Sequence, residues 1–101
     1  EKQLTDALSA NKGKISLVDF YADWCSPCRV LGQVLDTVRP AFPDLQVIKI
    51  DADKAPELCT KFNVTGIPRV LLFRGTEQVD GFVGAKNAND LKQFITKYYK
   101  D

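Results

Sequence analysis

The sequence of 101 residues contains no histidine and no methionine, and it has only three cysteines. Without an imidazole, the chain cannot build a Ser-His-Asp or a Cys-His nucleophilic site. Three thiolates also fall short of the four Cys or His ligands that a structural zinc site usually takes, so we expect no bound metal. The odd number of cysteines argues against a small secreted fold held together by disulfides.

Neither sign of charge is in excess, because 14 Lys and Arg residues stand against 13 Asp and Glu residues and give a net charge of +1. Phosphate backbones and anionic membranes attract a basic excess that this chain lacks, so we expect neither nucleic acid nor a membrane as a partner. No apolar run approaches the roughly 18 residues of a membrane span, and the first residues lack the apolar core of a signal peptide. These features predict a cytoplasmic protein. Because the chain starts at Glu1, we expect that something upstream was removed, and a periplasmic or other exported compartment is the alternative if that segment was a signal.

Hydrophobic residues make up 45% of the chain, which is enough for one core, so residues 1–101 are predicted to form a single domain. Apolar spacing predicts helices over residues 3–11, 27–42 and 55–62 and after Asn87 or Asn89, and strands over 15–22, 45–51, 70–73 and 78–83. Asp53 is the expected N-cap of the third helix. The short connection between the last two strands predicts that they are antiparallel neighbours. This order of elements is typical of a mixed sheet sandwiched between helices.

Two cysteines, Cys25 and Cys28, lie where an apolar strand gives way to an amphipathic helix. Unpaired backbone N–H groups and the positive end of the helix dipole meet at such a junction and favour a thiolate, so we expect Cys25 to be an exposed nucleophile with a lowered pKa. Cys28, one turn further on, is expected to lie deeper and to act as the resolving thiol. Pro27 suits the first turn of the helix. The alternative is a pair of inert thiols or a local disulfide staple.

The chain resembles the thioredoxin family along essentially its whole length, and three segments carry the resemblance. They are the run from Val18 to Arg29 around Trp24-Cys25-Ser26-Pro27-Cys28, the loop Gly66-Ile67-Pro68, and the turn Val83-Gly84-Ala85. The resemblance implies an α/β thioredoxin fold, with a central mixed sheet of four to five strands flanked by helices on both faces. Because only 18 residues precede Asp19, we expect four strands or a vestigial fifth, with the strand over 45–51 exposed at its edge.

Asp19 is an unusual carboxylate inside the apolar run of residues 15–22. Burial raises the pKa of a carboxyl group and makes it a usable proton acceptor near neutral pH. The resemblance implies that Asp19 handles the proton of Cys28 and that Lys49 lies near this acid. The alternatives are that Asp19 faces water at the end of the strand and that Lys49 extends to the surface.

The resemblance also implies a cis peptide bond before Pro68, which would present the backbone of Ile67 to an extended substrate segment. We expect a substrate-binding surface of low relief around Cys25, formed by Trp24, Ser26, Pro27, Ile67, Pro68, Arg69, Val83, Gly84 and Ala85. Ordinary core packing is the alternative role for Trp24.

Some residues depart from the family pattern. Ser26 replaces the glycine of familiar thioredoxins, which puts the reducing strength in question, and Gln33 replaces a proline that usually kinks the helix. Arg69 stands where threonine is common, and if its guanidinium reaches Cys25 it would stabilise the thiolate and favour substrates with nearby carboxylates. The alternative is that Arg69 faces solvent without effect.

Cys59 is expected to be buried and unreactive, and if it is exposed it could mediate dimerisation or oxidative regulation.

The sequence therefore predicts a protein disulfide oxidoreductase, a thioredoxin-type reductase that acts by dithiol–disulfide exchange. It would be a monomer without a bound cofactor, acting on disulfide-containing proteins and recycled by a reductase, which the resemblance suggests is the NADPH-dependent thioredoxin reductase. Two alternatives remain, an oxidase or isomerase in an exporting compartment and a thioredoxin-like binding module without turnover.

Overall fold

The computed structural model describes residues 1–99, and within this range the chain alternates between helices and strands in the predicted order. The elements are α1 (Lys2–Ala10), β1 (Ile15–Tyr21), α2 (Ser26–Val38), β2 (Gln46–Asp51), α3 (Pro56–Lys61), β3 (Arg69–Arg74), β4 (Glu77–Val83) and α4 (Ala88–Thr96). Two short 3₁₀ turns, Arg39–Ala41 and Ala52–Lys54, follow α2 and β2. The last two residues of the predicted domain lie outside the described residues.

The end of α2 and the N-cap of α3 differ most from the prediction. The apolar period of α2 continues to Phe42, but the α-helix ends at Val38, because Pro40 lacks the N–H that the next helical hydrogen bond requires. Ala55, not Asp53, is the N-cap of α3. Asp53 lies in the preceding 3₁₀ turn, where its N–H donates to the carboxylate of Asp51 at 3.0 Å.

The four strands form one mixed sheet in the order β2-β1-β3-β4. β1 runs parallel to β2 and antiparallel to β3, and the β3–β4 pair is antiparallel as predicted. β2 is an edge strand and none of its residues is fully buried, which agrees with the expected exposed edge. β1 is flanked on both sides, and six of its seven residues are buried.

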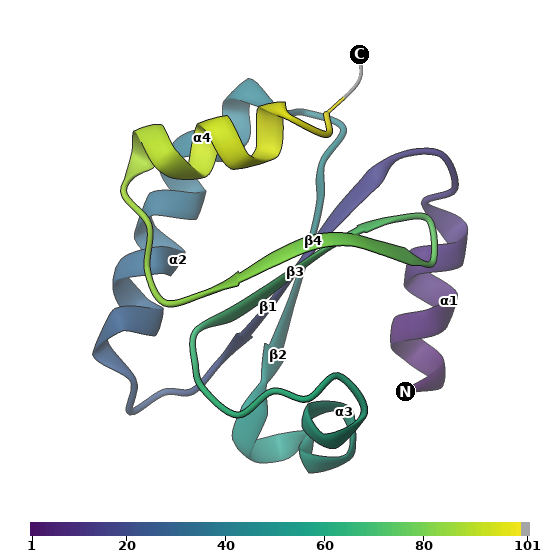
Figure 1. Ribbon diagram of the computed structural model, residues 1–101, viewed down its shortest axis with the longest axis vertical. Coiled ribbons are helices and arrows are strands. Elements are labelled where there is room, and N and C mark those ends of the chain that lie inside the picture. The colour runs from purple at the N-terminus through teal and green to yellow at the C-terminus, as the bar shows by residue number, and fades with distance from the viewer. Residues whose placement is uncertain (100–101) are drawn as a thin grey trace.

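Helices cover both faces of the sheet, with α2 and α4 on one side and α1 and α3 on the other (Figure 1). Successive strand residues point to opposite faces. Leu17 of β1 therefore packs in the core under α2 and α4, whereas Val18 and Phe20 pack in the core under α1 and α3. By the same alternation, Asp19 shares the α2 face with Leu17.

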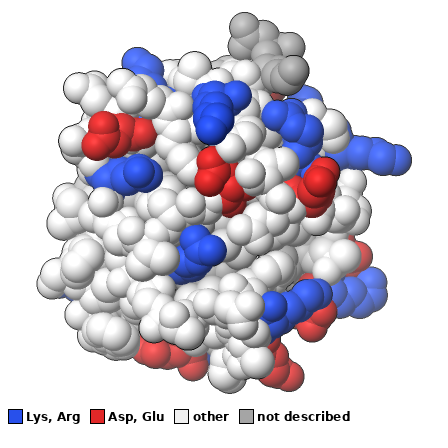
Figure 2. Space-filling model, viewed as in Figure 1, with Lys and Arg blue, Asp and Glu red and all other residues white. Residues whose placement is uncertain are grey.

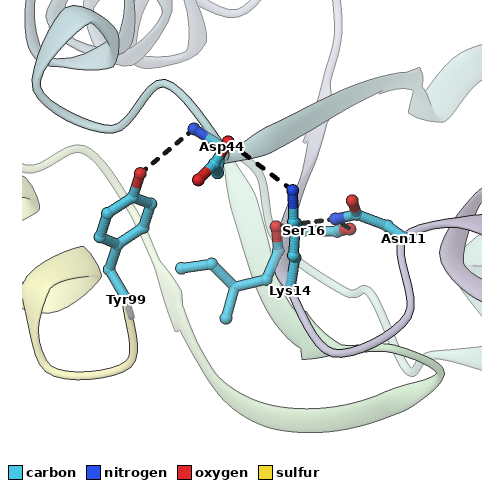
Figure 3. A network of polar contacts seen from close by, with 6 residues as sticks. Asn11, Lys14, Ser16, Asp44 and Tyr99 are labelled. Carbon is cyan, nitrogen blue, oxygen red and sulfur yellow. Dashed lines mark hydrogen bonds and ion pairs between the residues drawn. The ribbon is translucent and has the colours of Figure 1, made fainter. Parts of the chain in front are cut away.

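A network of polar contacts connects the segments at the end of the sheet where β1 begins (Figure 3). The Asn11 side-chain amide donates to the Ser16 hydroxyl at 2.9 Å, and this buried hydroxyl donates to Gln46 on β2 at 2.8 Å. The backbone N–H of Asp44 donates to the Tyr99 hydroxyl at 3.2 Å. These contacts join the start of β1 and β2 to the segment after α4, and they lie at the opposite end of the sheet from the carboxyl end of β1.

Basic and acidic side chains are interspersed over the face shown in Figure 2, without a large patch of one sign. The lower left of this view, where α2 begins in Figure 1, shows mostly uncharged residues. No helix in the described part of the chain is long and apolar enough to cross a membrane.

Candidate active site

Cys25 and Cys28 form a disulfide at the amino end of α2, directly after the carboxyl end of β1. Cys25 is the N-cap of the helix, with φ −92° and ψ 107°, and its sulfur accepts the Cys28 backbone N–H at 3.3 Å. The first helical N–H groups have no partner within the helix, so they favour negative charge on a sulfur at this position. Pro27 occupies the first turn, where a missing donor costs little.

The two cysteines are equally buried, which corrects the prediction that Cys25 is exposed. Each retains 4% of its accessible surface in this disulfide form. The two cysteines differ instead in their surroundings. Cys28 lines a cavity that also contains Asp19, and Cys25 is not among the residues that line it.

Asp19 is 2% exposed, and its Oδ1 has no hydrogen-bond partner among the described residues. It lies in a cavity of about 420 Å³ that also contacts Cys28, Gly32, Gln33, Asp36 and Lys49. Burial raises the pKa of Asp19 from 3.8 to about 6, and the positive charge of Lys49 opposes this rise. The alternative in which Asp19 faces water at the strand end is therefore wrong.

Lys49 is the neighbour of Asp19 in the parallel β1–β2 register, and it is an exposed residue that lines the same cavity. Its ammonium nitrogen lies 3.8 Å from the point that a side-chain carbon at Gly32 would occupy. The lysine thus reaches from the edge strand to α2. Both expectations for Lys49 are met in part, because it is exposed and it also lies near the buried acid.

The predicted loop Gly66-Ile67-Pro68 approaches the disulfide from β3. The Ile67–Pro68 peptide bond is cis, and Ile67 packs against the cluster of Ala22, Cys25 and Cys28. The Pro68 carbonyl accepts the Gly84 N–H at 2.8 Å, and Gly84 has φ +93°, a conformation that favours glycine. Pro68 itself is buried, so it shapes the surface around the disulfide and offers almost no contact area of its own.

Large apolar side chains are exposed in two of the segments predicted to form the substrate-binding surface. Trp24 is 69% exposed and Val83 is 65% exposed, which excludes core packing as the role of Trp24. The Trp24 indole N–H donates to the carboxylate of Asp53 at 2.9 Å, an interaction between residues 29 positions apart that no local pattern could indicate. Arg29 is a second residue that the sequence reasoning missed, and it donates to the Asp23 carbonyl at 2.8 Å and to the Ser26 hydroxyl at 3.3 Å.

The Arg69 guanidinium makes no hydrogen bond to Cys25, the contact on which its expected effect on the thiolate depended. Its Nη1 donates to the backbone carbonyls of Val70 at 3.2 Å and Phe82 at 3.1 Å, and so contacts the backbone of both strands of the β3–β4 hairpin. The local sequence places Arg69 next to the loop, and the hairpin register determines where its guanidinium lies.

Cys59 is the third cysteine, and it is partly buried and not in a disulfide. Burial, with a smaller contribution from the Asp53 carboxylate, raises the pKa of its thiol. A raised pKa lowers the thiolate fraction, in line with the prediction of an unreactive cysteine.

A disulfide at a helix amino end, with a cis-proline loop in front of it and a buried carboxyl group behind it, defines the class of thiol–disulfide oxidoreductases. The thioredoxin family model matches residues 1–97. The chain is 41% identical to thioredoxin of Buchnera aphidicola subsp. Baizongia pistaciae over 88 residues, which cover 86% of this chain and 81% of the relative. It is 38% identical to the chloroplastic thioredoxin Y1 of Arabidopsis thaliana over 99 residues, which cover 94% of this chain and 58% of the relative.

Solved structures agree with this assignment. A mutant thioredoxin from Halobacterium salinarum NRC-1 superposes with a TM-score of 0.88 at 37% identity, covering 100% of this chain and 87% of the other. Fasciola hepatica thioredoxin gives a TM-score of 0.88 at 32% identity, covering 96% of this chain and 92% of the other. The chain belongs to the thioredoxin family, and it is a thiol–disulfide oxidoreductase. The family acts on disulfide substrates and is recycled by reductases.

Replacing Asp19 by Asn should stabilise the protein at neutral pH. The folded state holds the Asp19 proton up to about pH 6, whereas the unfolded chain releases it near pH 3.8. The free energy of unfolding of the wild type therefore falls as the pH rises between these two values, by about 3 kcal/mol in total at roughly 1.4 kcal/mol per pH unit. Urea unfolding at pH 4 and pH 7.5 should show this loss in the wild type and a smaller one in Asp19→Asn. Asp36→Asn, at the exposed rim of the same cavity, should behave as the wild type, and equal pH dependence in Asp19→Asn would contradict the prediction.

Proposed function

We propose that the protein reduces disulfides in other proteins, with Cys25 as the nucleophile and Cys28 as the resolving thiol. The observation that carries this assignment is the unequal setting of the two sulfurs. Cys25 caps the helix and lies beside exposed Trp24, whereas Cys28 shares a cavity with the buried carboxyl group of Asp19. This difference supports Cys25 as the sulfur that meets the substrate and Asp19 as the proton acceptor for Cys28.

In the reduced protein, the Cys25 thiolate attacks one sulfur of the substrate disulfide and releases the other as a thiolate. A mixed disulfide now joins Cys25 to the substrate. Asp19 takes the proton of Cys28, and the resulting thiolate attacks the Cys25 sulfur. The second substrate sulfur leaves, the Cys25–Cys28 disulfide forms, and two electrons have passed to the substrate.

The substrate segment would dock on the surface formed by Trp24, Ser26, Pro27, Ile67, Val83 and Gly84, with Pro68 holding the loop in shape and Arg69 at its side. Trp24 and Val83 provide exposed apolar area, and the hydrogen bond to Asp53 orients the indole. Lys49 assists by placing a positive charge close to Asp19, which favours the ionised form of that acid.

The oxidised protein would be reduced by an NADPH-dependent thioredoxin reductase, as the family resemblance suggests. The two cysteines carry the electrons, so the protein needs no cofactor of its own. We further propose that the protein acts as a monomer, which leaves the surface around Cys25 accessible. A cytoplasmic location fits a reducing role, with an exported compartment as the alternative if the direction of exchange is reversed.

Replacing Cys28 by Ser should stop the reaction at the mixed disulfide. In a Cys59→Ser background, which removes the third thiol, reduced Cys28→Ser should form a covalent complex with a purified protein that has an accessible disulfide, and dithiothreitol should release it. Cys25→Ser is the matched control and should form no complex. Non-covalent binding that persists without either cysteine would favour a binding module and contradict the proposal.

Asp19→Asn should slow resolution of the mixed disulfide by at least about tenfold, because a positioned base contributes on the order of 10²-fold to proton transfer. The wild-type rate should fall as the pH drops below about 6, where Asp19 becomes protonated, and the variant should lose this inflection. Stopped-flow fluorescence of Trp24, the one tryptophan of the chain, provides the measurement. Asp36→Asn should retain the wild-type profile, and unchanged kinetics in Asp19→Asn would remove Asp19 from the mechanism.

The reduction potential of the Cys25/Cys28 couple should lie near the value of about −270 mV that is typical of thioredoxins, and not near the value of about −180 mV that is typical of disulfide isomerase. Equilibration with dithiothreitol buffers, followed by thiol alkylation, measures it. Ser26→Gly tests the contribution of the residue between the cysteines. A wild-type potential above about −200 mV would reverse the proposed direction and favour an oxidase or isomerase.

A further inference from the structure

The β3–β4 hairpin holds the guanidinium of Arg69 in a defined position. One nitrogen of its guanidinium, Nη1, donates to the carbonyls of Val70 and Phe82. Gly81 leaves the space that the guanidinium occupies, because a side-chain carbon there would lie 2.8 Å from Nη1. The position of the charge is therefore defined by the backbone of both strands, in contrast to that of a freely moving surface arginine.

The other two nitrogens of the guanidinium, Nε and Nη2, remain available to a ligand. Among residues 1–99, Nε and Nη2 of Arg69 make no hydrogen bond, and no Asp or Glu oxygen lies within 4.0 Å of its nitrogens. Arg69 is only partly buried. Because Nη1 is already engaged, the edge formed by Nε and Nη2 remains, and this edge presents two parallel donors that match the two oxygens of a carboxylate.

This free edge belongs to a residue at the border of the docking surface. Arg69 follows Pro68 directly and pairs with exposed Val83 across the hairpin. At Trp24, the indole N–H donates to the Asp53 carboxylate, which brings a negative charge to that part of the surface. A substrate carboxylate would thus be attracted at the β4 side and repelled near Trp24.

We propose that Arg69 is a specificity-determining residue, which selects disulfide substrates carrying an Asp or Glu side chain close to the reactive cystine on the β4 side. This inference rests on the proposed reductase function and adds the substrate class. The carboxylate binds to the Nε–Nη2 edge while the neighbouring cystine sulfur faces Cys25. The contribution is to docking, and the chemistry of exchange is unchanged.

A peptide scan tests the proposal in single turnover, without a recycling enzyme. Each peptide has one internal disulfide and carries either Asp or Asn at one of several positions on either side of the attacked cysteine. The pre-reduced protein is mixed with each peptide, and the second-order rate constant is followed by Trp24 fluorescence and by chromatography of the reduced peptide. The measured quantity is the ratio of the Asp rate to the Asn rate at each position, which is independent of the active fraction of any variant.

In the wild type, the ratio should reach about five at one or two neighbouring positions and should fall towards one in 1 M salt. Arg69→Gln should bring this ratio to about one, and Arg69→Lys should give an intermediate value, since it keeps the charge and loses the paired donors. Arg39→Gln is the charge-matched control. Arg39 is exposed at the far end of α2, about 20 Å along the helix from Cys25, and its removal should leave the ratio unchanged.

The outcomes separate the two proposals. If no peptide is reduced, the proposed reductase function fails. If the neutral peptides are reduced but the ratio is near one throughout, or if Arg69→Gln and Arg39→Gln lower it equally, then the role of Arg69 is overturned and the reductase function stands.

Discussion

The structure depends on the position of Cys25 as the N-cap of α2. This cap brings a sulfur to the point where unpaired helical N–H groups favour negative charge, and it places Cys28 one turn further on, against the sheet. The alternation of β1, which ends just before the cap, directs Asp19 to the same face. Helix, strand and disulfide are thus positioned together by one short junction between Tyr21 and Ser26.

The proposed role of Asp19 has a cost in stability. A carboxyl group that is 2% exposed and has an unpartnered oxygen among the described residues is unfavourable when charged, and its raised pKa expresses this cost. Lys49 offsets part of it from the edge strand. The polar network at the other end of the sheet, through Ser16 and Gln46, has no buried side-chain atom without a hydrogen-bond partner among the described residues, so the unsatisfied group lies at the end where exchange takes place.

The proposed docking surface combines parts that are distant in the sequence. Trp24 comes from the β1–α2 connection, Ile67 from the loop before β3, and Val83 from the end of β4. Family resemblance predicted these members, because each lies in a recognisable segment. Hydrogen bonds from Trp24 to Asp53 and from Arg69 to the β4 backbone add two features, and both join residues that no short pattern relates.

By itself, the sequence determined the order of helices and strands, the buried character of β1, and the location of both cysteines at a strand-to-helix junction. These properties follow from local periodicity and from proline and glycine positions, which act over a few residues. Tertiary structure decided the equal burial of Cys25 and Cys28, the capping of α3 by Ala55 in place of Asp53, and the direction of the Arg69 guanidinium. Each of these depends on which backbone segments the sheet order brings together, and that arrangement is set by packing of the whole core and not by neighbours in sequence.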